Sequence, residues 1–294
     1  EDLDITFEEF IDQLNPPRAT REYLLAWGSA LFGLESPKVS ALHVLSWVAA
    51  MGNSALNILN GMVNKFKHGT AAAIEALAGD VKGEIRLSTM AQVIEQKSDS
   101  VAVTLCDGST VTGRAVVVAT PINTWDSIEF KPPLKDSHKA MAEEKQGGES
   151  TKIWALVKDM PENYYAVGYD TKINWMATEY QVPEGNLIVG FGCDPERLDV
   201  DDPESIRAAV HEFLPDANII EVDAHNWNTD EFSQGTWMAY KAGQIVKHAR
   251  AIQEPFGRIA FAGSDLASGW AGWMDGALES GERAAGQIEA ILKS

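Results

Sequence analysis

The sequence is poor in the residues that build disulfide frameworks and metal sites. Only two cysteines, Cys106 and Cys193, occur in 294 residues, and they lie far apart. This spacing indicates no disulfide scaffold and no metal motif, so both thiols are expected to be reduced and partly buried. The six histidines also lack the spacing of metal ligands. Metal-dependent chemistry is therefore not indicated.

Basic residues and long apolar runs are scarce as well. The chain has 24 Lys and Arg against 43 Asp and Glu, which gives a net charge of -19. Such a charge disfavours binding to nucleic acid or to anionic membranes. No apolar run is long enough to span a membrane, and Glu1 to Asp4 do not resemble a signal peptide. We therefore expect a soluble, cytoplasmic protein without nucleic-acid or membrane partners.

Several catalytic motifs are missing. The sequence contains no Gly-x-Ser-x-Gly elbow, no phosphate loop and no Gly-x-Gly-x-x-Gly dinucleotide fingerprint. The nearest match, Gly190-Phe-Gly192, has Pro195 at the third glycine position. We interpret this stretch as the end of a strand.

The apolar patterns that are present predict helices first and strands later. Thr6 and Glu9 have capping-box spacing, and apolar residues recur at helical intervals up to about residue 51. The run 115–119 is continuously apolar, which predicts a strand buried on both faces. Asp202 and Pro203 predict the start of a helix that continues to about residue 214. Further strands are expected at 84–87, 91–95, 101–105, 152–158, 173–179 and 187–192.

The C-terminal forty residues predict a short buried strand, a glycine-rich turn and a helix. The apolar run from Ile259 ends at Gly263, and helical periodicity begins near Ala277. Helix starts carry unpaired N–H groups and a positive dipole end, so the backbone at 272–275 suits a negatively charged ring or phosphate. Tight packing of the helix on a sheet is the alternative reason for the glycines.

This C-terminal stretch resembles the flavin-binding signature of the FAD-dependent monoamine oxidase family. The matching motifs are Phe261-Ala-Gly-Ser-Asp and Gly272-Trp-Met-Asp-Gly-Ala-Leu-Glu-Ser-Gly-Glu-Arg-Ala-Ala. Similarity continues upstream in His225-Asn-Trp-Asn-Thr-Asp-Glu-Phe-Ser-Gln-Gly-Thr-Trp, Thr151-Lys-Ile and Ala115-Val-Val-Val-Ala-Thr-Pro. These motifs follow the family's order and are most similar to those of soluble fungal and bacterial amine oxidases.

The resemblance implies a mixed α/β (α+β) fold. In it, a Rossmann-like FAD-binding domain is interleaved with a substrate domain made of an antiparallel sheet and helices. Residues 1–66 would form the helical part of the substrate domain, and 141–229 its sheet. Residues 67–140 and 230–294 would form the FAD-binding domain.

The resemblance also implies which residues meet the cofactor. The backbone N–H of Met274 would contact the pyrimidine edge of the flavin, and Trp227 would lie beside its dimethylbenzene ring. Lys152 would hydrogen-bond through water to the reactive nitrogen, and an inward lysine in an apolar strand needs such a partner. The alternative is a lysine that extends to the surface. Other cofactor contacts are implied for Ala91, Thr120, Gly263, Ser264 and Gly272, with Pro121 beside the same groove.

Trp237 and Trp273 match the two aromatic residues that flank the substrate amine in the family. Electron-rich rings orient an amine and attract its cationic form. Thr236 matches the position of the cysteine that links FAD covalently in mitochondrial relatives. Because threonine cannot form a thioether, the FAD is expected to be non-covalent.

The implied reaction converts an amine to an imine, which water hydrolyses, while O2 reoxidises the flavin and yields H2O2. L-amino acid oxidation, cyclic-amine or nicotine-type oxidation, and dehydrogenation with a protein acceptor stay open. A non-catalytic fragment is a further alternative, because this sequence lacks the dinucleotide fingerprint. The fingerprint is then expected on an N-terminal half or a companion chain. A homodimer is also left open.

Overall fold

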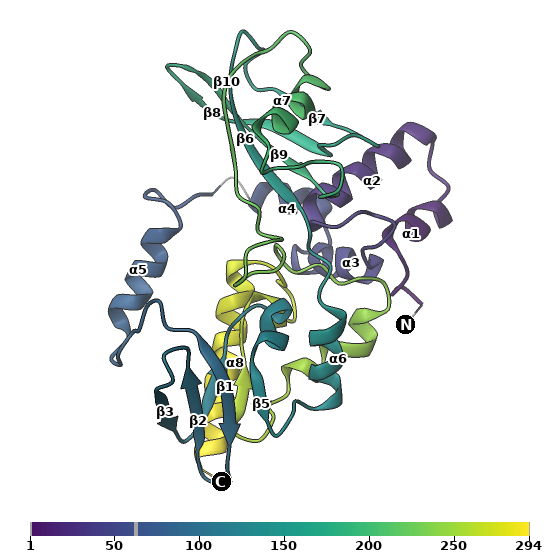
Figure 1. The fold of residues 1–294 in the computed structure, drawn as a ribbon. Helices are drawn as coiled ribbons and strands as arrows, with labels where there is room; N and C mark the ends of the chain where they lie inside the picture. Colours follow the sequence, from purple (N-terminus) through teal and green to yellow (C-terminus); the bar gives the residue numbers. More distant parts are fainter. Residues whose placement is uncertain (1, 62–63, 294) are drawn as a thin grey trace.

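A computed structural model describes residues 2–61 and 64–293 of the chain. The chain folds into a helical unit, a five-stranded sheet and a mixed α/β unit (Figure 1). The helical unit buries its own apolar core, which includes Phe32 and Trp47. The predicted capping box is confirmed, because the Thr6 side chain accepts from the Glu9 N–H and the Glu9 carboxylate accepts from the Thr6 N–H. Its helices are α1 (Phe7–Gln13), α2 (Arg18–Phe32), α3 (Ala41–Ala50) and α4 (Ala55–Gly61).

The five-stranded sheet is antiparallel in the order β10-β6-β9-β8-β7. The helix α7 (Pro203–His211) begins at its predicted cap, where the Asp202 side chain accepts from the Glu204 N–H. This helix packs against β6 and β10, and the core between them includes Ile153 and Val210. The strands are β6 (Thr151–Lys158), β7 (Tyr165–Val167), β8 (Trp175–Val182), β9 (Gly185–Gly192) and β10 (Asn218–Ala224).

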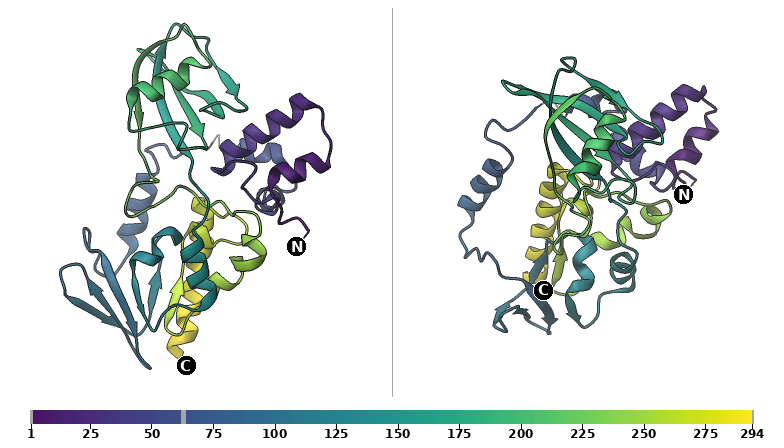
Figure 2. Two further views of the ribbon diagram at one scale, coloured as in Figure 1. Left: turned by 45° about the vertical axis from the view of Figure 1, so that its right-hand side comes forward. Right: turned by 45° about the horizontal axis from the view of Figure 1, so that its top comes forward.

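The mixed unit contains the predicted strand, turn and helix at the C-terminal end. The strand β11 (Ile259–Phe261) pairs in parallel with β4 (Val116–Val118), and α8 (Met274–Lys293) packs against both. Figures 1 and 2 show α8 running along this unit as one long helix. A second sheet has the order β3-β2-β1-β5. Its strands are β1 (Ala91–Gln96), β2 (Val101–Leu105), β3 (Thr110–Gly113) and β5 (Glu129–Lys131), and α6 (Asp136–Glu144) follows.

Three expectations are wrong. Residues 84–87 form no strand, and β1 begins at Ala91. The strand β4 is not buried on both faces, since Val117 is 41% exposed while Val118 is 4% exposed. Cys106 is exposed, in contrast to the buried Cys193. The first two expectations came from local apolar patterns and the third from the cysteine count, and none of these shows which segments cover a residue in the fold.

The helix α5 (Ala71–Asp80) was not predicted. It contains no buried residue, and Ile74 and Leu77 are more than half exposed. Figure 1 shows α5 at the side of the fold, apart from the other helices. No helix in the described part of the chain is both long and apolar enough to cross a membrane. The proposed domain boundaries stay predictions.

Two buried histidines make the fold sensitive to acid. His43 lies among the rings of Phe32, Trp47 and Tyr240, with Nε2 3.2 Å from the Met238 carbonyl oxygen. Burial lowers the pKa of His43 from 6.5 to about 4, although the Met238 carbonyl opposes the shift. Burial likewise lowers the pKa of His138 to about 4. Both side chains therefore stay neutral where an unfolded chain would take up protons.

We expect the free energy of unfolding to fall between pH 6.5 and about 4. A depressed folded-state pKa gives stability that is fully present above the unfolded pKa and is lost as the pH falls toward the folded value. Each unit of pKa difference corresponds to about 1.4 kcal/mol. Urea unfolding of the intact protein at several pH values measures the loss, which should be smaller in His43→Gln. The exposed His211 provides the control, His211→Gln. Equal pH slopes for all three proteins would refute the assignment.

Candidate active site

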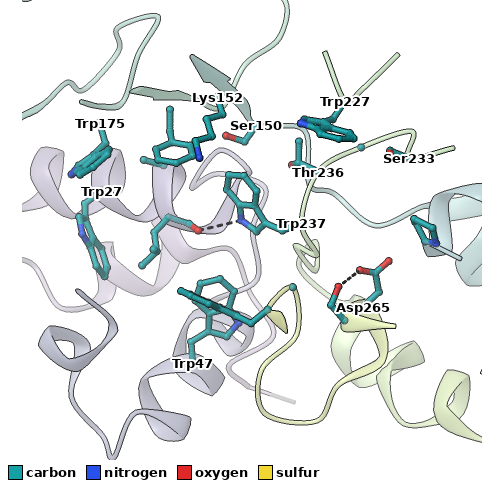
Figure 3. Close-up of a pocket in the computed structure, with 18 residues that line it drawn as sticks. Trp27, Trp47, Ser150, Lys152, Trp175, Trp227, Ser233, Thr236, Trp237 and Asp265 are labelled. Atoms are coloured by element: carbon teal, nitrogen blue, oxygen red, sulfur yellow. Dashed lines mark hydrogen bonds between the residues drawn. The ribbon is translucent and has the colours of Figure 1, made fainter. Parts of the chain in front are cut away.

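A cavity of about 610 Å³ lies where the helical unit, the five-stranded sheet and the C-terminal turn meet (Figure 3). Much of its wall is aromatic, and the polar side chains are few. The aromatic residues are Trp27, Trp47, Trp175, Phe191, Trp227, Trp237 and Trp273. Ser150, Lys152, Ser233, Thr236, Ser264 and Asp265 supply the polar side chains. An apolar cavity with a few convergent polar groups is typical of a small-molecule site.

Trp237 is held in the cavity wall by the end of α2. Its indole Nε1 donates to the Leu31 carbonyl at 3.2 Å. Gly33 ends α2 in the left-handed region with φ 69°, and a Cβ there would lie 2.8 Å from the Trp237 ring. The glycine thus both terminates the helix and leaves room for the indole.

Trp273 is placed by the turn that precedes α8. Gly272 has φ 86°, and a Cβ on it would lie 3.1 Å from the Met238 nitrogen and 3.3 Å from its carbonyl oxygen. The Gly272 N–H donates to the Ser264 carbonyl at 3.1 Å. The Trp273 ring packs edge-on against Trp47 with a centroid distance of 5.1 Å. This contact joins the C-terminal turn to the helical unit.

Lys152 enters the cavity from the sheet (Figure 3). Alternation along β6 buries Ile153 and leaves Lys152 exposed on the opposite face, where it lines the cavity. Its Nζ lies 4.9 Å from the Trp154 ring centroid and 5.7 Å from that of Phe191. Burial lowers the pKa of Lys152, the charge of Glu179 raises it, and that of Lys65 lowers it.

The polar end of the cavity is formed by the residues after β11. The Asp265 carboxylate accepts from the Ile122 N–H at 3.1 Å. It also accepts from the Ser264 hydroxyl at 3.2 Å (Figure 3). Burial raises the pKa of Asp265, while these two hydrogen bonds lower it. The carboxylate is thus engaged with its own chain.

This end of the cavity fits a large, flat, anionic group. The N-terminus of α8 begins directly after Trp273, and the first amides of a helix attract negative charge. Gly263 has φ 127°, and a Cβ there would meet only the Ala119 oxygen, at 3.9 Å. Trp227, which lines the cavity, is 48% exposed, and Met274, the first residue of α8, is 42% exposed, so both present uncovered apolar surface. A flavin ring with its phosphates would match both the charge and the apolar surface.

The family model for flavin-containing amine oxidoreductases matches residues 1–289. The chain belongs to this family. It is 34% identical to (S)-6-hydroxynicotine oxidase of Paenarthrobacter nicotinovorans, over 100% of this chain and 68% of the relative. It is 29% identical to pseudooxynicotine dehydrogenase of Pseudomonas sp, over 98% of this chain and 59% of that relative. The flavin-containing family thus accounts for almost the whole printed sequence, which spans about two thirds or less of these relatives.

Solved structures of flavin amine oxidases share the fold. Putrescine oxidase bound to putrescine superposes with a TM-score of 0.83 at 19% identity, covering 98% of this chain and 69% of that one. Cyclohexylamine oxidase from Brevibacterium oxydans gives 0.81 at 18% identity, covering 100% and 69%. The predicted α/β fold class and the family resemblance are confirmed. The stretch Gly190 to Gly192 lies at the end of β9, as expected.

The flavin oxidoreductase fold brings most of the predicted site residues together. Lys152, Trp227, Ser264, Gly272 and the tryptophan pair line the cavity. Other predicted residues do not line it: Ala91 opens β1 opposite Leu105, and Thr120 has its carbonyl bonded to the Trp125 indole. Gly263 and Met274 flank the turn outside the cavity wall. Their roles as flavin contacts stay predictions.

Sequence patterns did not mark every residue of the site. Trp27 and Trp47 follow helical apolar periodicity, which predicts core residues, and Trp47 is only 2% exposed. Trp175 and Phe191 lie in strands whose alternation does not reveal which face meets the cavity. Tertiary packing supplied the rest.

Gln146 fixes the segment that carries Trp237. Its Oε1 accepts from the N–H groups of Gly148 and Ala239 at 2.5 and 2.9 Å, and its Nε2 donates to the Thr236 carbonyl at 3.2 Å. The side chain is buried, so each lost bond leaves an unpaired group at a cost of about 1–3 kcal/mol. Gln146 is therefore a positioning residue for the aromatic wall.

Gln146→Leu is expected to raise the KM for an amine about tenfold, which is the effect of roughly 1.4 kcal/mol. The value of kcat should change less, because no reacting atom is touched. Gln146→Glu keeps the acceptor oxygen and should restore part of the affinity. Gln181→Leu, an exposed substitution on β8, is the control. Steady-state kinetics of the folded variants measure both constants, and an unchanged KM in Gln146→Leu argues against the positioning role.

Proposed function

We propose that the protein is a flavin-dependent amine oxidase. The observation that carries the proposal is the aromatic cavity, which Trp237, Trp273 and Lys152 all line and whose wall includes the turn directly before α8. When bound, the flavin would accept the two electrons that the amine loses as its C–N single bond becomes a double bond. The amine loses two electrons and two protons to become an imine, and water converts the imine to a carbonyl compound plus ammonia or an amine. O2 takes up the two electrons and two protons and becomes H2O2.

The residues of this chain bind and orient the amine. The indoles of Trp237 and Trp273 exclude water and present electron-rich faces to the nitrogen, while the ammonium of Lys152 favours arrival of the neutral amine. Ser264, Gly272 and the first amides of α8 would hold the flavin, and its negative charge would be stabilised there. Met274 and Trp227 would cover its edges.

Anaerobic mixing of the intact protein with a panel of amines tests the proposal. Bleaching of the flavin absorbance, followed by peroxide formation after O2 is admitted, supports it. The panel includes amino acids, because Lys152 is the cationic residue among the described lining residues and would pair with a substrate carboxylate. It also includes cyclic amines, because the similar relatives are named for nicotine-type substrates. Flavin that no amine reduces would exclude the proposed activity.

Non-covalent FAD forms part of the proposal. Thr236 lines the cavity, and its neutral hydroxyl is a far weaker nucleophile than a cysteine thiolate and has no sulfur with which to form a thioether to the flavin. Acid precipitation of the intact protein is therefore expected to release the flavin completely into the supernatant. Absorbance of the supernatant and pellet measures the partition. Flavin that remains in the pellet would contradict a dissociable cofactor.

We also propose that the FAD pyrophosphate is held by a Gly-x-Gly-x-x-Gly turn outside the printed sequence, on further residues or on a companion chain. Cytoplasmic location and a homodimer stay predictions. The native mass of the intact protein, measured together with its flavin content, tests the companion chain and the dimer at once. If a protein made of the printed sequence alone retained FAD stoichiometrically, the proposed pyrophosphate-binding turn outside this sequence would be contradicted.

A further inference from the structure

Two stacked aromatic rings join Lys152 to a second lysine outside the cavity wall. The Lys152 Nζ lies 4.9 Å from the centroid of the Trp154 ring, two residues along the same strand. The Trp154 ring stacks on Tyr180 of β8, with centroids 6.5 Å apart and an interplanar angle of 13°. The Nζ of Lys65, from the segment before α5, lies 4.8 Å from the centroid of the Tyr180 ring. Two positive charges therefore share one pair of rings.

An irregularity in β8 puts a carboxylate beside these rings. The pairing of β8 with β9 shifts between Thr178 and Tyr180, which leaves Glu179 as an extra residue in the strand. A bulge of this kind re-aims the side chains next to it. The Glu179 carboxylate forms an ion pair with Lys65, and the Glu179 side chain is 26% exposed. This negative charge is thus fixed in position and partly shielded from solvent.

Both members of this ion pair act on the charge of Lys152. Burial lowers the pKa of Lys152, while the Glu179 carboxylate opposes that shift and the Lys65 ammonium adds to it. Charges that are partly buried are screened less by salt than exposed ones, so these effects are not confined to low ionic strength. Lys152 thus has a counter-ion that it shares with Lys65.

The other elements around the cavity supply no competing counter-ion. Among the described lining residues, those that come from α2 and α3 are uncharged. Asp265, from the turn after β11, is the carboxylate in that set, and it is engaged with Ile122 and Ser264. This leaves Glu179 as the carboxylate that acts on the ammonium of Lys152.

We propose that Glu179 is a positioning residue for the charge of Lys152. Held by Lys65 at the irregularity in β8, its carboxylate keeps the Lys152 ammonium charged beside the apolar wall, where a cation stabilises the negative charge that develops on O2. Lys65 limits this effect through its own positive charge. The inference rests on the proposed amine oxidation and names two residues outside the cavity wall that set the charge of that site.

Removing either partner of the ion pair should shift the pH dependence of the O2 reaction, in opposite directions. Stopped-flow mixing of the reduced intact protein with O2 gives the pH at which wild-type protein retains half of its maximal rate. At that pH we expect Glu179→Gln to retain about a quarter of its own maximal rate, and Lys65→Met about three quarters. Loss of a merely structural ion pair would move both variants the same way, and that result would overturn the proposal.

Glu184→Gln is the matched control for the loss of a negative charge. Glu184 is exposed in the turn between β8 and β9, so this variant removes the same charge from the same hairpin. Its pH profile should coincide with that of wild-type protein. A shift equal to that of Glu179→Gln would show an effect of net charge alone and would refute the specific role of Glu179.

Direct titration of Lys152 separates this inference from the proposed function. Reductive methylation with 13C labels the lysines of the intact protein and keeps their positive charge, and the NMR signal missing from Lys152→Met identifies Lys152. Its titration midpoint should fall in Glu179→Gln and rise in Lys65→Met. If the midpoints move in this way but no amine reduces the flavin, the proposed function fails alone. If both midpoints equal that of wild-type protein and amines are oxidised, the inference fails alone.

Discussion

Gly272→Val is expected to yield folded protein that retains little or no flavin. At φ 86°, a β-branched side chain is strongly strained, and its Cβ would lie 3.1 Å from the Met238 nitrogen and 3.3 Å from the Met238 oxygen. Backbone atoms cannot move aside as the end of a flexible side chain does. Strain of this kind costs about 1–3 kcal/mol, and its relief would move Trp273 and the start of α8 together. The proposed flavin-binding wall would then lose its shape.

The flavin-to-protein absorbance ratio measures this effect, with circular dichroism to show that the variant is folded. Gly269→Ala is the matched control in the same turn. A Cβ on Gly269 would lie 4.0 Å from Ala50, which is an ordinary contact. Full flavin content in a folded Gly272→Val protein would be incompatible with the proposed wall.

Lys152→Met is expected to slow the reaction of the reduced protein with O2 by roughly tenfold to a thousandfold, the scale of a lost electrostatic contact in an active site. Electron transfer to O2 develops negative charge, and a cation at the apolar wall stabilises it. Reduction by the amine should be less affected. Lys158→Met, at the exposed far end of the same strand, is the control.

Stopped-flow mixing of the reduced protein with O2 measures this rate. The rate in wild-type protein should decrease as the pH rises through the pKa of Lys152, because the ammonium is lost. Burial lowers that pKa, so the decrease should occur below the ordinary value of 10.5. If reduced Lys152→Met and Lys158→Met reacted with O2 at the same rate, Lys152 would have no role in the reaction with O2.

Local signals predicted the start and end of the chain well. The side chains of Thr6 and Glu9 cap a helix within one turn, and Gly263 and Gly272 punctuate the turn before α8, so short-range chemistry determines these elements. Lys152, Trp237 and Trp273 were indicated by the resemblance to the family motifs, not by these local signals. All three line one cavity.

Long-range packing explains what could not be predicted. Trp47 has the apolar spacing of a core residue, and only its contact with Trp273, far along the chain, makes it part of the site. Val117 is apolar yet 41% exposed, because the covering of a strand depends on distant segments. The alanine-rich α5 buries no residue, so its apolar pattern did not indicate a packed face.

The cavity lies among separate apolar cores, and this position links ligand binding to folding. Its wall takes Trp47 from the helical core, and Trp175 from the sheet whose opposite face is packed against α7. Ser264 comes from the turn after β11. A molecule that fills the cavity touches all three parts, so its binding free energy opposes their separation. Cofactor and substrate would thus act as cohesive elements that make the parts unfold cooperatively.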